Sequence, residues 1–576
     1  MDLKDIIETD IWKLYSKSTN FLNLRGLYEE TDRCCRFYIG DQWHGLKLSK
    51  SIEPITYNFI KQIVLQKVSV ITENLFAINY SPENLENIEF MQKAKATCDL
   101  LNKKASKVWD LQQLDSKVKK WVKKAGIVGE AICYVDFDKD IVIENISNVD
   151  IMYGDENQPD IQSQPYILVR QRKPVSEIRK MAKELGKGED QILSIIGDNN
   201  TSTIAGDDGK QELDDKTWLI TKFWKDENGD VYYSRSTRYV DLDKKVKMGI
   251  NLYPFAHLNW EEQEGNARGI SEVKPLIANQ IETNRNATRR AVVTKNISFP
   301  HKVVNTDAIE NPNDIDRVGA TIKFKDMGST RASDVFMMTT PAQMGSDAEK
   351  LQAELINLSK ELSNAGDSTT GNIDPSSASG KAILAVQQAQ QQPLNDQTMA
   401  LKTFLEDIAR LWFAFWKANA KDLKINYSEK DLITGEDIQI QEKVDKTVLK
   451  NLETSVKVDI TPRGAYDKYA QELSLENLMT TGFITFEEYV DALDPDSVMP
   501  KVKLQNIINK RKEAQRQINA IDEEATMLQD FAMAQNNDAN SNAMMQDYGQ
   551  SLEKAQQTGY NADSNRANVA NNTNLA

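Results

Sequence analysis

Apolar side chains recur every three or four residues along the middle of the chain, which is the spacing of one face of a helix. Within residues 267–296 this face consists of Val273, Leu276, Ile277, Gln280, Ile281, Asn284, Ala287, Ala291 and Val292. Ser271 can cap the start of the helix, and Pro275 is tolerated because first-turn amides have no intrahelical acceptor. The pattern predicts a helix of about 26 residues, which is about 39 Å long at a rise of about 1.5 Å per residue.

A second helix is predicted within residues 343–364. Ser346 and Glu349 have the spacing of a capping box, in which each side chain bonds the backbone amide of the other residue. The apolar positions that follow are Ala348, Leu351, Leu355, Leu358 and Leu362. A seam this narrow, with polar residues on both flanks, is typical of a helix that packs against neighbouring helices, here one of about 20 residues.

The segments around these two helices have different patterns. Within residues 297–342, alternation at Lys302–Asn305 and Ala320–Phe324 predicts short strands. Residues 365–380 are rich in glycine, serine and threonine, which do not continue a helix. Within residues 381–462 we expect a third long helix, interrupted at Pro393, and then further strands.

The first 266 residues alternate between helical and strand patterns. Residues 1–36 predict a pair of amphipathic helices, and helical periodicity returns over 53–74 and 91–125. Alternation over 126–155 predicts two or three strands, and Asn228-Gly229 is a strong signal for the turn of a hairpin. The mixture predicts an α+β domain.

The last part of the chain is helical and then loses its pattern. Within residues 463–528, Gly482 ends one helix, and Thr485 with Glu488 forms a second capping box that begins the next. Residues 529–576 are rich in asparagine, glutamine and alanine. Such a segment cannot bury enough apolar surface to offset the entropy of ordering it, so we expect disorder or loose helix there.

Length and charge limit the classes of protein to which this chain can belong. A chain of 576 residues is long enough for about three to five domains. Its formal net charge of −15 argues against a protein that grips duplex DNA tightly. The chain has no run that approaches 18 apolar residues and opens on acidic residues, so neither a transmembrane helix nor a secretory signal is expected. We interpret its four cysteines as free thiols in a reducing compartment; they are Cys34, Cys35, Cys98 and Cys133.

Motifs for catalysis or for a cofactor are missing from the sequence. Gly380-Lys381 is not a phosphate-binding loop, because Pro375 stands where the first glycine belongs and Ala382 replaces the serine or threonine. The lysines between residues 117 and 124 predict a solvated helix face rather than a phosphate or membrane site. Neither metal-ligand nor triad spacing is found among the three histidines, His44, His257 and His301, which we expect to be surface or packing residues.

The order of helix, small β module, helix, flexible loop and long helix resembles the portal proteins of tailed double-stranded-DNA bacteriophages. Short local matches add to it, including the segment Phe37–Gly45, the glycines Gly126 and Gly129, and the helical unit around Gly482. The resemblance extends to about residue 525. It implies an α+β portal fold with a wing (1–266), stem helix 1 (267–296), a small α/β clip (297–342), stem helix 2 (343–364), a tunnel loop (365–380), a long helix and wing return (381–462) and a helical crown (463–528), followed by the tail (529–576).

The resemblance also implies a function. Portal subunits form a ring, dodecameric in the family, at one capsid vertex, and double-stranded DNA is packaged and ejected through its channel. The implied partners are the terminase large subunit, head-completion adaptor and tail proteins, and the major capsid and scaffolding proteins, with no membrane and no cofactor. Such a protein is assembled in the host bacterial cytoplasm and resides in the virion. An acidic channel wall fits this role, because it repels phosphates and lets DNA slide.

Three groups of residues are the candidate sites under this resemblance. The tunnel loop that sets the bore contains Asp367, Ser368, Thr369, Thr370 and Asn372. The inter-subunit seam of the stem contains Leu351, Leu355, Leu358 and Leu362. A basic patch of the stem and clip contains Arg285, Arg289, Arg290, Lys295 and Lys302. Two interpretations of the patch remain open: basic rings that meet DNA phosphates or acidic partner residues, and salt bridges to acids of a neighbouring subunit.

Two other classes of protein remain as alternatives. One is a structural head or tail scaffold protein without a channel, and the other is a nucleic-acid enzyme whose site has no recognisable motif. Electron micrographs of the purified protein separate them, because only the portal predicts rings with a central hole.

Overall fold

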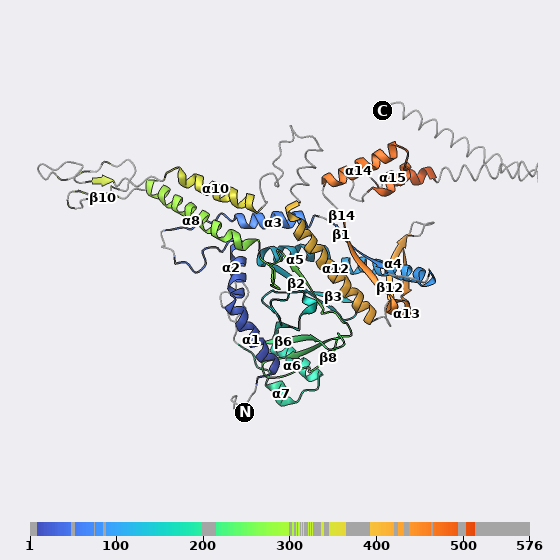
Figure 1. The fold of residues 1–576 in the computed structure, drawn as a ribbon. Coiled ribbons are helices and arrows are strands. Elements are labelled where there is room, and N and C mark those ends of the chain that lie inside the picture. Colours follow the sequence, from blue (N-terminus) through green and yellow to red (C-terminus); the bar gives the residue numbers. More distant parts are fainter. Residues whose placement is uncertain are drawn as a thin grey trace, which may run out of the picture. The chain divides into compact units, whose positions relative to one another are not determined.

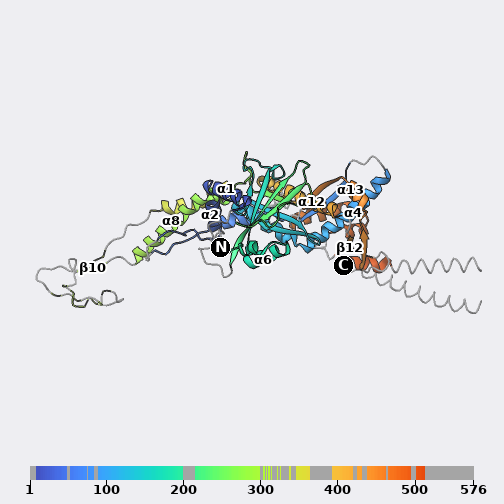
Figure 2. The same ribbon diagram turned by 90° about the horizontal axis from the view of Figure 1, so that it is seen from below.

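The chain divides into two compact units, Met1–Thr461 and Pro462–Ala576, and Figures 1 and 2 show the ribbon from two directions. The computed structural model describes residues 8–47, 52–73, 75–83, 88–198, 215–298, 345–363, 392–419, 424–430, 437–461, 465–493, 501 and 503–512, and between 298 and 345 the residues 302–304, 307, 309–311, 313, 315, 321, 323, 325 and 336–338.

Helices of the first unit form where the apolar positions have helical spacing. In chain order they are α1 (Asp10–Leu24), α2 (Leu27–Ile39), α3 (Phe59–Ile71), α4 (Ile88–Leu111), α5 (Leu114–Val128), α6 (Val175–Glu184), α7 (Glu189–Leu193), α8 (Val273–Ser298), α10 (Asp347–Leu362), α12 (Asn395–Ala418) and α13 (Lys446–Asn451), with 3-10 turns η2 (Ile161–Ser163) and η5 (Gln392–Leu394). The helical pattern over 91–125 is split between α4 and α5, because Gln113 adopts a left-handed φ of 51°.

The strands form antiparallel sheets. In spatial order the two larger sheets are β3-β2-β9 and β4-β5-β6-β7-β8, and the two-stranded sheets are β1-β14, β10-β11 and β12-β13. The strands are β1 (Leu75–Pro82), β2 (Glu130–Phe137), β3 (Ile141–Ile146), β4 (Ile151–Tyr153), β5 (Tyr166–Pro174), β6 (Lys216–Lys225), β7 (Val231–Ser236), β8 (Val246–Lys247), β9 (Phe255–Asn259), β10 (Lys302–Val304), β11 (Phe336–Met338), β12 (Lys424–Lys430), β13 (Asp437–Lys443) and β14 (Thr454–Thr461). The α+β prediction is confirmed.

One turn prediction and the predicted strands of residues 297–342 can be compared with the backbone. The hairpin of β6 and β7 closes at Gly229, whose φ of 79° confirms the prediction from Asn228-Gly229. The strand expected at Lys302–Asn305 is β10, and its partner is β11. Most of Ala320–Phe324 lies outside the described residues.

The main core lies between α12 and the three-stranded sheet. The aromatic residues Phe404, Trp412 and Trp416 of α12 are fully buried, and Figure 1 shows this helix beside the sheet. Trp121 of α5 meets Phe404 edge-on, with ring centroids 5.3 Å apart. After α12 the chain pairs with a strand from near its start, because β14 is bonded along its whole length to β1.

The five-stranded sheet is covered on both faces. Tyr15 and Leu22 of α1 pack on one face against a cluster that includes Leu168 and Ile220. The other face contributes Phe223 to a second cluster that also contains residues of β2 and β9. This sheet is thereby fixed to the three-stranded sheet from which α8 departs.

The predicted solvated lysine face is confirmed in part. Lys119 and Lys120 are exposed. Lys124, in contrast, is half-buried and donates to the carbonyl oxygen of Ile146 at 2.6 Å. Burial lowers the pKa of Lys124 to about 8, and the nearby Glu130 carboxylate opposes this shift only partly.

The second unit contains α14 (Ala465–Thr480) and α15 (Phe486–Ala492). Gly482 follows α14 with a φ of 78°, as expected for a glycine that ends a helix. The capping box at α15 is confirmed: the Thr485 side chain accepts from the Glu488 amide, and the Glu488 carboxylate accepts from the Thr485 amide. Tyr489 and Val490 of α15 and Leu493, which follows it, form a small core with Ile508.

The predictions for cysteines, membrane spans and metal sites can be compared with the structure over the described residues. Cys34, Cys98 and Cys133 are buried free thiols, and Cys35 is a half-buried one. Among the described helices, none combines the length and hydropathy that a membrane span requires. The same part of the chain holds no cluster of three or more side chains suited to a metal ion.

Candidate functional site

The candidate site is the pair of long helices α8 and α10, which lie side by side (Figure 1). Their interface is polar. Asn279 donates to the Ser359 hydroxyl at 3.0 Å, and Asn286 donates to the carbonyl oxygen of Ala348. Arg290 donates to the Gln352 amide oxygen at 3.2 Å. The side of α10 that faces α8 therefore carries serine, alanine and glutamine rather than leucine.

At about 100° per residue, the exposed leucines of α10 are centred about 80° around the helix from the residues that contact α8. Leu351, Leu358 and Leu362 have exposed fractions of 46%, 43% and 77%. Leu355 is half-buried. Three of the four seam leucines thus remain exposed beside α8, and the packing of the seam between subunits stays a prediction.

The predicted capping box of α10 is wrong. Ser346 makes no side-chain cap bond, because its backbone is already helical, with φ −58° and ψ −20°. The carbonyl oxygen of Ser346 accepts from the amides of Glu349 and Lys350 at 3.1 and 3.2 Å. Backbone acceptors therefore satisfy the first amides, and the Glu349 carboxylate forms an ion pair with Arg290 at 3.4 Å instead. The helix has 16 residues rather than about 20.

The arginines of the basic patch form ion pairs with carboxylates of the same subunit. Arg285 and Arg289 both approach Glu282, at 3.8 and 3.3 Å. One carboxylate between two guanidinium groups leaves an excess of positive charge on this side of α8. Lys295 is exposed, and the side chain of Lys302 in β10 lies outside the described residues.

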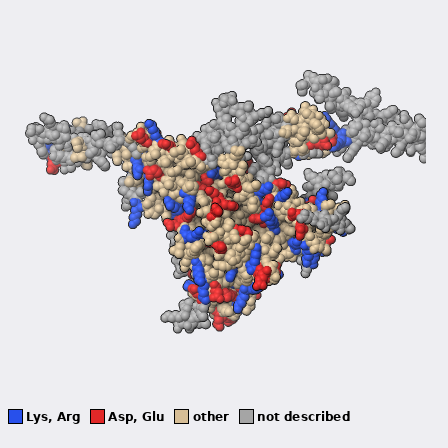
Figure 3. Space-filling view, viewed as in Figure 1, with Lys and Arg blue, Asp and Glu red and all other residues tan. Residues whose placement is uncertain are grey.

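These ion pairs do not exclude either interpretation of the patch, because pairs at exposed positions are worth only about 0–1 kcal/mol and can exchange partners. Figure 3 shows basic and acidic side chains mixed over the part of this face where α8 and α10 lie. The helix pair therefore presents a mixed surface rather than a strong field of one sign.

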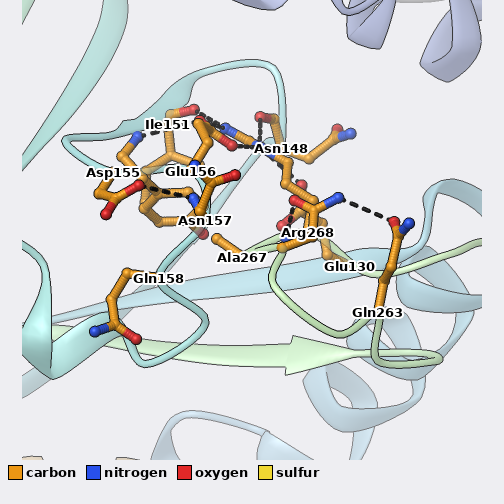
Figure 4. A network of polar contacts seen from close by, with 12 residues as sticks. Glu130, Asn148, Ile151, Asp155, Glu156, Asn157, Gln158, Gln263, Ala267 and Arg268 are labelled. Atoms are coloured by element: carbon orange, nitrogen blue, oxygen red, sulfur yellow. Dashed lines mark hydrogen bonds and ion pairs between the residues drawn. The ribbon is translucent and has the colours of Figure 1, made fainter.

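The segment before α8 contains a buried arginine that connects distant parts of the first unit. Arg268 donates to both carboxylate oxygens of Glu156, at 2.9 and 3.0 Å, and to Glu130 at 2.8 Å. It also donates to the carbonyl oxygens of Asn148 and Ile151 (Figure 4). Every nitrogen of the guanidinium group has an acceptor, as a buried cation requires.

Glu130 completes this network. Its side chain is 1% exposed and accepts from Nε2 of His257 at 2.8 Å as well as from Arg268. Burial alone would raise the pKa of Glu130, but Arg268 and His257 together outweigh burial and lower it. His257 is therefore a packing residue, as predicted, with a carboxylate partner that the sequence pattern did not indicate.

A close backbone crossing lies next to the network. A Cβ atom on Gly129 would stand 2.3 Å from the carbonyl oxygen of Gly269, and one on Gly269 would stand 2.4 Å from that of Gly129. Any side chain at either position would force the two backbones apart. Gly129 has a φ of 98° as well, so only glycine satisfies both demands.

The start of α8 is held beside this crossing. The Ser271 hydroxyl accepts from the Lys274 amide at 3.0 Å, which confirms the predicted cap. The Glu272 carboxylate accepts from Lys67 at 2.7 Å and from the indole of Trp260 at 3.0 Å. The first turn of α8 is thus bound to α3 and to the end of β9, so the helix leaves the sheets in a fixed direction.

The predicted tunnel loop lies outside the described residues. This applies to Asp367, Ser368, Thr369, Thr370 and Asn372. The helix expected after Pro393 is present as α12.

Residues 25–297 match the sequence profile of the family described as "Phage P22-like portal protein". The matched segment is a little under half of the chain and runs from the start of α2 to the end of α8. No curated protein gives a significant match to the chain. The match confirms the resemblance to phage portal proteins that the order of segments indicated.

Proposed function

We propose that this chain, which its family match supports as a phage portal protein, forms the ring-shaped channel at one capsid vertex through which double-stranded DNA is packaged and ejected. The proposal rests on the family match. The matched residues include the Arg268 network and α8 up to residue 297. The family is structural and non-enzymatic. The protein therefore acts mechanically, as a component of the virion.

Ring closure is assigned to α10. Three leucines with exposed fractions of 43–77% form a face of the helix beside the one that α8 contacts. Burying a leucine side chain gains about 1.5–3 kcal/mol, so the same contact repeated around a ring is a strong driving force. A dodecamer, as in the family, is the proposed assembly.

DNA contact is assigned to the side of α8 that carries Arg285 and Arg289, and to the tunnel loop at 365–380. Arg285 and Arg289 share Glu282, so their charge is partly neutralised. A strongly basic channel would hold DNA, because affinity rises steeply with the number of phosphates that are neutralised. The partly neutralised pair and the net charge of −15 support weak, sequence-independent contact with sliding DNA.

Partners are assigned by segment. The clip at 297–342 would dock the terminase large subunit during packaging and head-completion adaptor or tail proteins afterwards. The surrounding wing would contact the major capsid and scaffolding proteins. Assembly in the host cytoplasm completes the proposal.

Negative-stain electron microscopy of the purified full-length chain tests the function. Rings with a central hole are the expected result. Filaments or monomers alone would support a scaffold protein without a channel, and nucleotide-dependent turnover would support an enzyme. Either outcome would overturn the portal assignment for this chain.

The tunnel-loop assignment has its own test. Deleting Asp367–Ile373 should permit rings and procapsids but impair packaging or retention of DNA, because the copies of the loop together set the bore. The measurement is the amount of nuclease-protected DNA in mutant particles. Full-length DNA in normal yield would place this loop outside the channel, since shortening a surface loop is nearly silent.

A further inference from the structure

Three polar side chains on α8 stand four residues apart and bind the main chain of a segment far away in sequence. This segment, residues 52–58, precedes α3 and has no regular secondary structure; we call it the strap. Thr288 accepts from the Ile55 amide at 3.0 Å, and Asn284 accepts from the Tyr57 amide at 3.0 Å. Gln280 donates to the Tyr57 carbonyl oxygen at 2.6 Å and accepts from the Ile60 amide at 3.4 Å.

The spacing of these contacts follows from helix and strand geometry. Four residues of an α-helix span about 6.0 Å, and two residues of an extended chain span about 6.6 Å. An extended strap that runs antiparallel to α8 can therefore bond every second residue to every fourth helix residue, as Ile55 and Tyr57 do with Thr288 and Asn284. We call Gln280, Asn284 and Thr288 the ladder.

The ladder is buried, and each amide oxygen and nitrogen in it has a hydrogen-bond partner. Gln280 and Asn284 have exposed fractions of 0% and 2%. The Asn284 oxygen accepts from Tyr57 and from Gln280, while its nitrogen donates to Gln42. Gln42 in turn donates to the carbonyl oxygen of Phe37 in α2. Because no amide group is left unpaired, a shift of α8 along or around its axis would break several buried hydrogen bonds together.

The ladder leaves one side of α8 open. Successive helix residues are about 100° apart, so the ladder occupies an arc of about 80°. The residues that contact α10 are centred about 140° to one side of it, and Arg285 and Arg289 about 120° to the other. The side chains of these two arginines are 53% and 63% exposed, in agreement with this geometry.

We propose that Gln280, Asn284 and Thr288 are positioning residues, which clamp the strap and thereby hold α8 in the rotation and axial register that turn Arg285 and Arg289 to its open side. The clamp binds backbone atoms, so it depends on register and not on the side chains of the strap. That the open side faces DNA rests on the proposed function; the clamp itself does not.

Hydrogen exchange of the purified full-length chain, followed by mass spectrometry, tests the clamp. The strap amides should be protected although the segment is irregular. Asn284→Leu should accelerate exchange over residues 52–60 at least about tenfold, while β5 and β6 keep their protection. The matched control is Asn279→Leu on the same helix, which removes the bond to Ser359 and should leave the strap unchanged.

Two exchange results would overturn the clamp. One is strap exchange in the natural chain as fast as in an unprotected peptide. The other is a loss of protection in β5 and β6 with Asn284→Leu, which would make Asn284 an ordinary core residue. Thr288→Val is the milder second variant, because it keeps the shape and removes only the acceptor for the Ile55 amide. If the strap amides exchange at the same rate in Thr288→Val and in the natural chain, this result also counts against the proposal.

Thiol labelling tests the positioning. A cysteine placed at Arg289 on the open side should react with a maleimide much faster than one placed at the buried Thr283, which is 0% exposed. The natural thiols give little background, because burial raises the pKa of Cys35 to about 11 and the other three are buried. Adding Asn284→Leu should lower the ratio of the two rates at least about tenfold, because α8 is no longer held in one rotation.

An unchanged ratio would show that the ladder does not position α8. The comparison is made between chains of the same assembly state, separated by size-exclusion chromatography. A chain that shows the expected exchange and labelling but forms no rings would refute the portal proposal and leave the clamp in place. The two hypotheses therefore fail separately.

Discussion

Replacing Arg268 with methionine should lower the free energy of unfolding of the first unit by about 3–5 kcal/mol, because removing one partner of a buried ionic network leaves the others uncompensated. Glu130 and Glu156 are 1% and 7% exposed, and both depend on this guanidinium group. Methionine has a similar volume, so the loss reports charge and hydrogen bonding rather than a cavity. The melting transition of the full chain, followed by circular dichroism, is the measurement.

Arg238→Met is the matched control. Arg238 is half-exposed and pairs with Glu8 at 2.8 Å, so its replacement should change stability by less than about 1 kcal/mol. Combining Arg268→Met with Glu130→Gln and Glu156→Gln should restore part of the loss, since the neutral side chains tolerate burial better. Equal melting temperatures for the natural chain and Arg268→Met would contradict the role of this network.

The loss at Arg268 should also depend on pH. In the natural chain the pKa of Glu130 is lowered in the folded state, so its contribution to stability is present above its usual range and is lost as the pH falls through the folded value. Without Arg268, burial dominates and the pKa of Glu130 is raised instead. The variant then gains stability on protonation, so its deficit against the natural chain should be larger at pH 8 than near pH 5.

Local patterns in the sequence predicted those features whose causes are local. The periodicity around Val273 gave α8, Asn228-Gly229 gave a hairpin turn, and Thr485 with Glu488 gave a capping box. Each depends on side chains within a few residues of one another. The order of such elements was also enough to indicate a resemblance to portal proteins, which the match to residues 25–297 supports.

The features that the sequence did not indicate depend on contacts across long separations. Arg268 meets Glu156 and Glu130, which lie 112 and 138 residues earlier in the chain, and no periodic pattern records such a pairing. Gln280 and Asn284 were predicted on the buried face of α8 from spacing alone. Their hydrogen bonds to the strap, more than 200 residues away, explain how amides occupy apolar positions.

The capping-box prediction for α10 failed for a different reason, whereas the packing of its leucine seam between subunits stays a prediction. The spacing of Ser346 and Glu349 is correct for a capping box, but the backbone continues its helical conformation through Ser346 and uses carbonyl acceptors. The leucine spacing is likewise correct for helix packing. A pattern shows that a face must be covered but not by which partner, and within the subunit α8 contacts the adjacent face of α10.

Leu358→Asp combined with Leu362→Asp should abolish rings and leave folded subunits. The two side chains are 43% and 77% exposed in the single chain, so aspartate is tolerated there before assembly. In a ring the same positions would be buried against a neighbour, where an unpaired carboxylate costs several kcal/mol. Because every subunit repeats the defect, the ring state should be undetectable by size-exclusion chromatography with light scattering and by electron microscopy.

The control for this variant is an equally drastic change on another exposed leucine. Leu193 is 66% exposed in α7, far from α10 in sequence, and Leu193→Asp should leave ring formation unchanged. Circular dichroism must show the same helical content and melting transition for the seam variant and the natural chain, which separates an assembly defect from misfolding. If folded Leu358→Asp, Leu362→Asp subunits still close into rings, these leucines do not face a neighbouring subunit, and ring contacts must be sought on another face of the chain.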